Sequence, residues 1–264
     1  MDRILLFIPM YNCEKQIIRV LEKVKFAENY FSEVIVVNNL STDNGEEAVK
    51  RFLDKNEMKL KIKLLNNNFN YGLGGSHKVA FQYAIDNSFD YVAVLHGDDQ
   101  GNISDIIPLI KNGDYVKYDC LLGARFLRSS KLAGYSKIRT FGNKVYNVLF
   151  SIGTGYKIYD LGSGINMYKV SSLQNKFYFK YKDDLMFNYC MILGSVYYGL
   201  KMKFFPITWS EEDQVSNVKM FNQAITVLRL LMAYVVNKRK FVEAEHRSKL
   251  VDSYSAQIRY ENNS

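Results

Sequence analysis

The first part of the chain alternates between short apolar runs and segments whose apolar residues recur every three or four positions. Short apolar runs are typical of buried strands, and the longer periodic segments are typical of helices that pack on them. The expected strands are 4–8, 34–37, 60–65 and 91–95. Strands separated by helices of about 10–15 residues predict βαβ units. We therefore expect an α/β protein with a mostly parallel, Rossmann-like sheet flanked by helices.

The second half of the chain is less regular. Short strands are expected at 121–124, 164–168 and 203–207, and a helix at about 184–199. From Val218 onward, apolar residues recur at three- to four-residue steps, which predicts an amphipathic helix. The residues after Lys238 are polar, and we expect them to be loosely held. The expected division is one domain over 1–216, followed by an amphipathic C-terminal helix and a polar tail over 217–264.

Length and charge narrow the class of protein. The chain has 264 residues, of which 48% are hydrophobic, so it can bury the core of one large domain. Its formal net charge of +8 favours anionic partners such as diphosphates or an anionic membrane surface. The aromatic residues do not form a known nucleic-acid-binding motif, so we expect no nucleic-acid partner. The longest uncharged stretch, 185–200, is shorter than the roughly 20 residues of a membrane span.

The cysteines and the first strand bear on the compartment. Cys13, Cys120 and Cys190 lie far apart, with no CxxC pair and no zinc-binding spacing. Their odd number argues against a disulfide framework and favours a reducing compartment. The apolar run at 4–8 is short and ends at Pro9, so we expect a strand there and no signal peptide.

Polar loops follow four of the predicted strands at their carboxyl ends. These loops are 9–12, 38–43, 70–75 and 96–100. An open α/β sheet binds ligands beyond the carboxyl ends of its strands, so the four loops are expected to border one pocket.

The fourth loop suggests a metal site. Asp98 and Gln100 are two residues apart after a predicted strand, and residues two apart in an extended chain point the same way. A carboxylate and an amide oxygen would then face one hard cation, Mg2+ or Mn2+. The ion would bridge diphosphate oxygens and neutralise charge on a departing nucleotide. The alternative is an acidic turn in which Asp99 or Asn102 caps the next helix.

The third loop is rich in glycine. Gly74 lies in the sequence GLGG, which opens a predicted helix with Ser76 as its expected cap. Such a loop can bring backbone N–H groups close to a phosphate. The alternative is a tight turn that packs the helix on the sheet. His77 stands where a dinucleotide-binding motif needs its third glycine, so that motif is excluded.

Seven segments together resemble the family 2 glycosyltransferases, particularly the polyprenyl- or dolichyl-phosphate sugar synthase branch. In order, they are IPMYNCEKQI, VIVVNNLSTDN, YGLGGSHKVAF, VLHGDDQGN, LLGARFLRSSKLAGYSKIRTFGN, DLGSGINMY and FPITWSEEDQVSNVK. The resemblance covers about residues 4–220. It implies the GT-A fold and inverting transfer of a sugar from a nucleotide-diphosphate donor, with a UDP-sugar favoured.

The resemblance implies roles for residues in the first two loops. Pro9, Tyr11 and Glu14 would line the nucleoside pocket. Asn38 or Asn39 stands where the family has an aspartate that contacts the base. An amide can both accept and donate hydrogen bonds, so the identity of the base stays open.

The resemblance also implies ligands for the diphosphate. Asp98 and Gln100 match the family's metal-binding aspartate and glutamine, and His96 replaces the first acidic residue of that motif. His96 would bond the ribose or, when protonated, hold a phosphate; the alternative is a structural histidine. Arg125 would clamp a phosphate bidentately, or else pair with a local carboxylate. Lys137 and Arg139 are weaker candidates for the phosphate, and they stand in the same stretch of chain.

A hydroxyl acceptor needs a base to take its proton. The pair Asp183 and Asp184 resembles the family's E-D pair, and Asp184 is the first choice of base, unless it only caps the helix that follows. A phosphate acceptor would need no base. Glu211, Glu212 and Asp213 stand where the phosphate-acceptor branch usually has an arginine. This difference favours the hydroxyl of a lipid-linked sugar over a polyprenyl phosphate and makes Asp213 the second choice of base.

Segments 145–152 and 221–236 are amphipathic, with basic residues nearby. Such helices can lie on an anionic membrane surface, or they can pack on the domain or on a partner chain in a homo-oligomer. The resemblance favours peripheral association with the cytoplasmic face of the membrane and a role in surface polysaccharide or glycan synthesis.

Two other functions compete with glycosyl transfer. A sugar-nucleotide pyrophosphorylase would carry a basic glycine-rich loop directly after its first strand, and 9–13 holds neither glycine nor arginine. A binding protein that keeps the fold without turnover is the other possibility. Its support comes from His96, Asn38 and Asn39, which replace acidic residues of the family.

Overall fold

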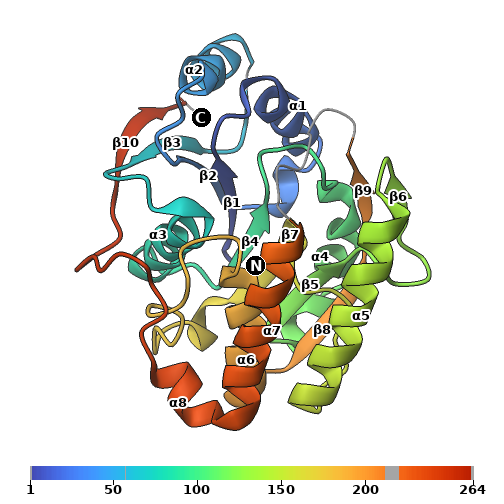
Figure 1. The fold of residues 1–264 in the computed structure, drawn as a ribbon. Helices are drawn as coiled ribbons and strands as arrows, with labels where there is room; N and C mark the ends of the chain where they lie inside the picture. Colours follow the sequence, from blue (N-terminus) through green and yellow to red (C-terminus); the bar gives the residue numbers. More distant parts are fainter. Residues whose placement is uncertain (1, 57, 212–219, 263–264) are drawn as a thin grey trace.

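The computed structural model describes residues 2–56, 58–211 and 220–262, so the predicted base Asp213 lies outside the described residues. An eight-stranded sheet forms the centre of the molecule, in the order β10-β3-β2-β1-β4-β7-β5-β8 (Figure 1). Its strands are β1 (Ile4–Met10), β2 (Glu33–Asn38), β3 (Ile62–Asn67), β4 (Tyr91–Leu95), β5 (Cys120–Ala124), β7 (Ile165–Lys169), β8 (Met202–Pro206) and β10 (Ala256–Glu261). Only β7 and β10 run against the other strands of this sheet, which confirms the expected mostly parallel arrangement.

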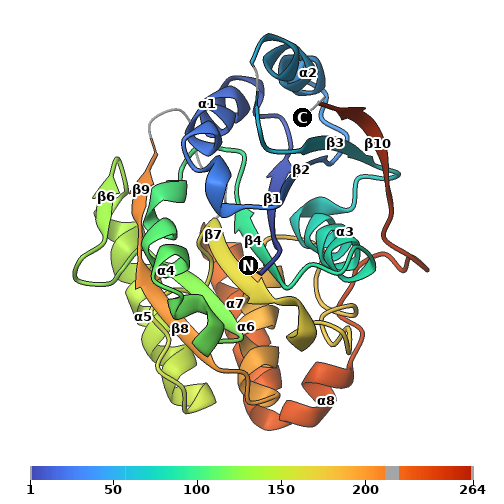
Figure 2. The ribbon, with the colours of Figure 1, turned by 180° about the vertical axis from the view of Figure 1, so that it is seen from behind.

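Helices cover both faces of the sheet (Figures 1 and 2). They are α1 (Glu14–Lys25), α2 (Gly45–Lys55), α3 (Gly72–Asp86), α4 (Ile107–Lys111), α5 (Lys137–Thr154), α6 (Phe187–Tyr197), α7 (Met220–Val236) and α8 (Lys238–Glu243). Side chains of β1 alternate between two apolar cores, with Leu5 and Phe7 on the α3 and α6 side and Leu6 on the α1 side. The sequence pattern of a buried strand followed by a helix therefore produces three layers.

A short parallel pair, β6 (Lys131–Ala133) and β9 (Thr208–Ser210), lies beyond the carboxyl end of β8. It brings residues that follow β5 and β8 next to the loop after β4, since the Ser210 amide donates to the Gln100 carbonyl at 2.9 Å. The second half of the chain thereby closes one side of this sheet edge.

Two element boundaries differ from the sequence predictions. Helix α3 already begins at Gly72, so Ser76 lies inside it, and the Ser76 hydroxyl donates to the Gly72 carbonyl at 3.0 Å rather than capping the helix. Helix α6 begins at Phe187, because the chain first makes a turn at Asp184.

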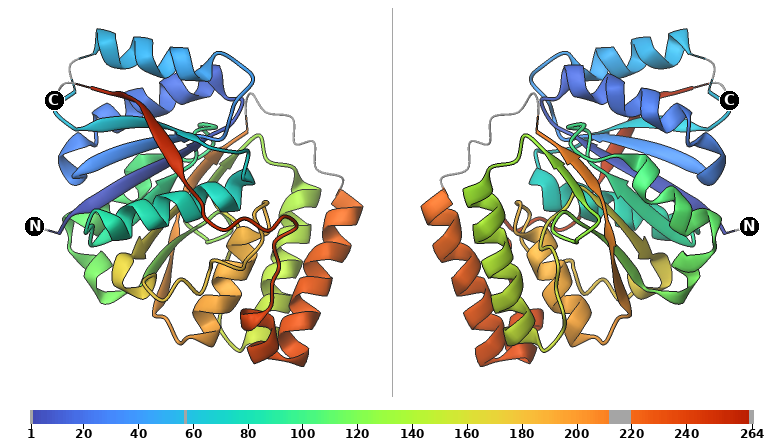
Figure 3. Two further views of the ribbon diagram at one scale, coloured as in Figure 1. Left: turned by 90° about the vertical axis from the view of Figure 1, so that its left-hand side faces the viewer. Right: turned by 90° about the vertical axis from the view of Figure 1, so that its right-hand side faces the viewer.

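The prediction of a loosely held tail after Lys238 is wrong. Helix α8 is followed by a segment that crosses the molecule and ends as β10, antiparallel to β3 (Figure 3). We call residues 244–262 the C-terminal strap. Asn262 closes it, since its side chain accepts from the Ile62 amide at 2.7 Å and donates to the Leu60 carbonyl at 3.1 Å. An edge strand is held by backbone hydrogen bonds, so its sequence need not be apolar.

Helices α5 and α7 lie side by side at one end of the molecule (Figure 3). Gly153 of α5 faces Leu231 and Val235 of α7 without room for a larger side chain. Several apolar residues of the pair remain exposed, namely Ile138, Phe141, Val148, Ile152, Met232 and Val236. Among the described residues, no helix combines the length and the apolar character needed to cross a membrane.

Candidate active site

The candidate site lies where β1 and β4 separate at the carboxyl edge of the sheet. From β1 the sheet continues to β2 on one side and to β4 on the other, which is the kind of switch point where open α/β sheets bind ligands. The Gly97 amide donates to the Pro9 carbonyl at 3.1 Å, and the Thr42 amide donates to the side chain of Asn12 at 2.8 Å. The loops after β1, β2 and β4 are thus joined at this point, and Tyr11 among them is 51% exposed.

The two asparagines of the second loop differ in their contacts. The side-chain oxygen of Asn39 accepts from the Asn67 side chain and the Tyr71 amide, both at 2.9 Å, and its nitrogen donates to Asn70 at 2.8 Å. Three of its four hydrogen-bonding positions are used internally. Asn38 accepts from the Ser41 amide at 2.9 Å, and its nitrogen has no partner among the described residues. The structure therefore gives Asn39 an internal role and leaves Asn38 as the base-contacting candidate.

The glycine-rich loop serves packing. The Gly74 amide donates to the Asp183 carbonyl at 2.7 Å, and a Cβ on Gly74 would lie 2.5 Å from the Lys182 carbonyl oxygen. Gly72 has φ +74, and a Cβ there would lie 2.5 Å from the Asp183 carbonyl oxygen. The absence of side chains lets residues 182–183 lie on the start of α3. The Gly74 N–H is occupied, so the predicted phosphate contact of Gly74 gives way to the alternative of a packing turn.

The loop after β4 is a turn rather than an extended chain. Asp99 has φ 62, and the Gln100 amide donates to the Asp98 carboxylate at 3.2 Å. The chain is not extended here, so the reason for predicting that Asp98 and Gln100 point the same way is wrong. Asp99 is anchored to α1 by Arg19 at 2.7 Å and Lys23 at 2.6 Å.

Asp98 is a carboxylate that no basic side chain of the described residues binds. It has no ion-pair partner within the part of the chain that the structure describes. Burial raises the pKa of Asp98 to about 6, the Gln100 N–H opposes this rise, and the carboxylates of Asp99 and Glu211 add to it. A carboxylate in this setting suits a divalent cation, whose charge favours the ionised form.

The residues around Asp98 fit a metal ion that is shared with a substrate. In residues 2–56, 58–211 and 220–262, no group of three His, Cys, Asp or Glu side chains is placed to hold an ion by itself. Mg2+ and Mn2+ are often held by one or two protein ligands, with the remaining ligands from water and substrate phosphate. The Asp98 carboxylate, which accepts from the Gln100 backbone amide, supplies an oxygen of the kind that such an ion takes.

The contacts of His96 are with other parts of the protein. Its backbone amide donates to the Gly164 carbonyl at 2.9 Å, and a Cβ on Gly164 would lie 3.0 Å from the ring. Burial and, after it, the charge of Arg125 together lower the pKa of His96 to about 4, which disfavours its protonated form in the unliganded protein. A contact of His96 with ribose or phosphate stays a prediction. Its Nε2 atom is buried and has no hydrogen-bond partner among the described residues.

Arg125 forms a bidentate ion pair. Its Nε and Nη2 atoms each lie 2.8 Å from an oxygen of Asp160, and its backbone amide donates to Asp160 at 2.8 Å. The indole ring of Trp209 lies 5.1 Å from its guanidinium carbon. The structure shows the alternative for Arg125, a local carboxylate partner. A phosphate contact through the remaining nitrogen of the guanidinium stays a prediction.

Arg139 is also paired. It lies 2.5 Å from Glu211, one of the acidic residues that replace the family's arginine, and its guanidinium lies 4.4 Å from the ring centre of Tyr135. The sequence singled out Arg139 and Glu211 separately, and β6 and β9 bring them together.

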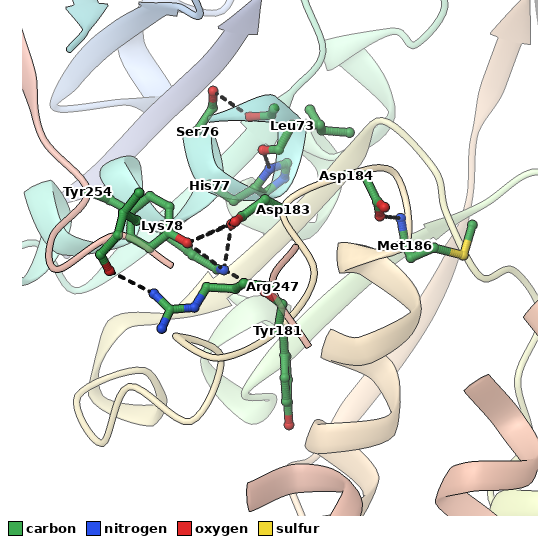
Figure 4. Close-up of polar contacts among 12 residues, drawn as sticks. Leu73, Ser76, His77, Lys78, Tyr181, Asp183, Asp184, Met186, Arg247 and Tyr254 are labelled. Carbon is green, nitrogen blue, oxygen red and sulfur yellow. Dashed lines mark hydrogen bonds and ion pairs between the residues drawn. The ribbon is translucent and has the colours of Figure 1, made fainter. Parts of the chain in front are cut away.

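The two aspartates before α6 have opposite environments (Figure 4). Asp184 is exposed and accepts from the Met186 amide at 2.8 Å, so it caps the turn and keeps its second oxygen without a partner in the described chain. Asp183 is bound by Lys78 at 2.7 Å and by the Tyr254 hydroxyl at 2.8 and 3.0 Å. Lys78 and Tyr254 were not among the site residues predicted from the sequence. The available signal for Lys78 was its place in the predicted helix segment SHKVAF, next to apolar residues.

Known proteins were compared with the chain by sequence. A family model described as Glycosyl transferase family 2 matches residues 6–177. An uncharacterized protein of Methanocaldococcus jannaschii, MJ1222, is 23% identical over 206 residues, which cover 78% of this chain and 81% of that protein.

Solved structures share the fold. TarS of S. aureus, residues 1–349, has a TM-score of 0.59 at 18% identity, over 89% of this chain and 66% of that one. Glucosyl-3-phosphoglycerate synthase from Mycobacterium tuberculosis, in complex with Mn2+, UDP and glucosyl-3-phosphoglycerate, has a TM-score of 0.59 at 10% identity, over 99% and 90%. At these identities the similarity shows the GT-A fold alone. The family model spans more than half of the chain, and the chain therefore belongs to glycosyl transferase family 2.

Proposed function

We propose that this protein is an inverting glycosyltransferase that moves a sugar from a UDP-sugar to a hydroxyl of a lipid-linked saccharide. The observation that carries the proposal is the uncompensated carboxylate of Asp98 at the switch point between β1 and β4. Family membership supports glycosyl transfer. TarS crystallised with UDP-GlcNAc, and the mycobacterial synthase crystallised with UDP and Mn2+, support a uridine donor and a divalent cation for this chain.

The donor would lie across the loops after β1, β2 and β4. Tyr11 offers an exposed ring for the base, Asn38 offers an amide, and Pro9 and Glu14 border the same loops. When bound, Mg2+ or Mn2+ at Asp98 and Gln100 would neutralise charge on the diphosphate.

Asp184 would act as the base in the transfer. Inversion requires the acceptor hydroxyl to attack from the side opposite the leaving diphosphate, and a carboxylate near that hydroxyl accepts its proton as the new bond forms. Asp184 is exposed and has one oxygen without a partner among the described residues. Asp213 remains the second choice of base. Arg125 remains a candidate for a phosphate oxygen of donor or acceptor.

The surface formed by α5 and α7 supports the proposed acceptor and location. These helices expose large apolar side chains and contain no acidic residue, whereas Lys137 and Lys144 lie in α5 and 238–240 is the basic run KRK after α7. Apolar and basic residues together suit an anionic membrane surface. We propose that this surface places the protein on the cytoplasmic face of a membrane, where a lipid-linked acceptor of glycan synthesis is presented. A second copy of the chain is the alternative occupant.

A panel of nucleotide sugars tests the proposal. Wild-type protein should release UDP from at least one UDP-sugar when Mg2+ or Mn2+ is present, and chelation should stop the release. Asp98→Ala should abolish it. Asp99→Asn is the matched control, because Asp99 is the neighbouring carboxylate but is ion-paired with α1. No release and no thermal shift with any nucleotide diphosphate and metal would contradict the proposal. Pyrophosphate release from a nucleotide triphosphate would favour a pyrophosphorylase instead.

A further inference from the structure

We propose that Asp183 is a positioning residue for the base Asp184, and that the C-terminal strap holds Asp183 in place through Tyr254. The inference rests on the proposed function, in which Asp184 takes the acceptor proton. Three segments that are far apart in the sequence meet here: α3, the turn before α6, and the strap (Figure 4).

Lys78 brings α3 into this contact. Its side chain is 1% exposed, and its ammonium group lies 2.6 Å from the Tyr181 carbonyl, 2.7 Å from Asp183 and 3.2 Å from the Tyr254 hydroxyl. An ammonium group has three N–H donors, and these contacts match all of them. A buried charge needs an opposite charge, so Lys78 holds the Asp183 carboxylate on the surface of α3.

Tyr254 brings the strap into the same contact. Its hydroxyl bonds the Asp183 carboxylate, and its ring packs edge-on against Tyr71 at 5.2 Å and Phe179 at 5.3 Å. Arg247 of the strap donates to the Val251 carbonyl at 2.9 Å, and its guanidinium carbon lies 4.8 Å from the ring centre of Phe179. The strap is therefore docked by side chains at this point, in addition to the backbone pairing of β10.

The backbone of Asp183 is held as well. The Gly74 amide donates to the Asp183 carbonyl at 2.7 Å, so α3 holds both the backbone and the side chain of this residue. The side chain of Asp184 has only its hydrogen bond with the Met186 amide in the described structure, and in Figure 4 it lies away from the Lys78 and Tyr254 group. An exposed aspartate without support would sample several positions. Fixing the preceding residue restricts Asp184 to one, as general-base catalysis requires.

Two phenylalanine variants of the strap test this inference. Tyr254→Phe removes the hydroxyl that bonds Asp183. Tyr260→Phe is the matched control, because Tyr260 also lies in the strap and also bonds a carboxylate, that of Asp54 on α2. Four quantities are measured for each full-length variant: kcat and donor KM with the best UDP-sugar of the panel, hydrogen–deuterium exchange of the peptide over 181–187, and the thermal midpoint.

We expect Tyr254→Phe to lower kcat by roughly tenfold with donor KM unchanged, because a small misplacement of a reacting group costs up to about 100-fold. Exchange at 181–187 should become faster. Tyr260→Phe should change neither kcat nor the exchange at 181–187. Unchanged kcat or unchanged exchange in Tyr254→Phe would overturn the inference, and so would an equal loss of kcat in Tyr260→Phe. An inactive wild type would instead overturn the proposed function. In that case, the difference in exchange at 181–187 between Tyr254→Phe and Tyr260→Phe would still test whether Tyr254 orders the turn before α6.

Discussion

The turn after β4 and the turn before α6 each carry two adjacent aspartates, and in each pair only one carboxylate is bound to basic groups among the described residues. Asp99 is held by Arg19 and Lys23, and Asp98 has no basic partner in the described structure. Asp183 is held by Lys78, and Asp184 is exposed. In both turns, one aspartate anchors the loop while its neighbour has no basic partner among the described residues.

The two anchors differ in burial. The side chains of Arg19 and Lys23 are 43% and 40% exposed, whereas that of Lys78 is 1% exposed. Exposed ion pairs contribute little because water screens them, and removing one partner of a buried pair leaves an uncompensated charge. We therefore expect the turn before α6 to depend on its anchor more strongly than the turn after β4.

The largest expected effect is on catalysis. It comes from Asp184, the exposed aspartate of the turn before α6. Asp184→Asn keeps an oxygen for the Met186 amide but cannot accept a proton. We expect kcat to fall about 1000-fold, within the range for loss of a general base. UDP affinity, measured by calorimetry with Mn2+, should stay unchanged. A variant that retains wild-type kcat would remove Asp184 as the base and favour Asp213 or a phosphate acceptor.

The next largest effect is on stability. It comes from Asp183, which is ion-paired with Lys78. Asp183→Asn leaves the Lys78 ammonium buried without an anion, which should lower the free energy of unfolding by about 3 kcal/mol. Denaturant titration measures this loss. The double variant Lys78→Met with Asp183→Asn removes the orphan charge and should recover part of the stability. If the double variant is less stable than Asp183→Asn alone, burial of the charge is not the cause.

A smaller effect should separate the two aspartates after β4. Asp99→Asn should lower the free energy of unfolding by about 1 kcal/mol or less, because its basic partners are exposed. Asp98→Asn should raise the thermal midpoint at neutral pH, because the raised pKa of Asp98 means that its ionised form is disfavoured in the folded protein. Equal destabilisation by both substitutions would contradict the distinction between anchor and free carboxylate.

The smallest effect concerns the docking of the strap. Hydrogen bonds from Arg247 lower the pKa of Glu245 to about 2, from an ordinary value of 4.5. A lowered carboxylate pKa stabilises the fold above about pH 4.5, and this contribution is lost as pH falls towards 2. Glu245→Gln should therefore show a lower thermal midpoint than wild type at pH 6 and the same midpoint near pH 2. A constant difference across this range would contradict the linkage.

Much of the fold was predictable from local pattern. The apolar runs that became β1, β2 and β4 are buried on both sides, and the loops that follow them are polar because they reach the edge of the sheet. The strand β10 was not predictable, because Ala256–Glu261 is held by backbone pairing with β3 and most of its side chains are exposed or partly exposed. A polar edge strand has no apolar periodicity to find.

The candidate site was predictable in its location and less so in its members. Asp98, Tyr11 and Asn38 lie at the predicted sheet edge, where the loops after β1, β2 and β4 are joined. Gly74 and Asn39 come from the polar loops after β3 and β2 at the same sheet edge, but their hydrogen-bonding groups are used internally. A polar residue at a strand end indicates a ligand site only when its hydrogen-bonding groups are left unused, and that depends on the neighbours.

By itself, the sequence determined the layered α/β architecture, the polar edge of the sheet and the motif order of its family, since these depend on spacing along one segment at a time. Tertiary structure decided which aspartate of each pair is neutralised. Lys78, Asp183 and Tyr254 meet from positions 71 to 176 residues apart in the chain, and their contact forms only when α3, the turn before α6 and the strap pack together. Compensation of a charge depends on distance in space, which no local pattern encodes.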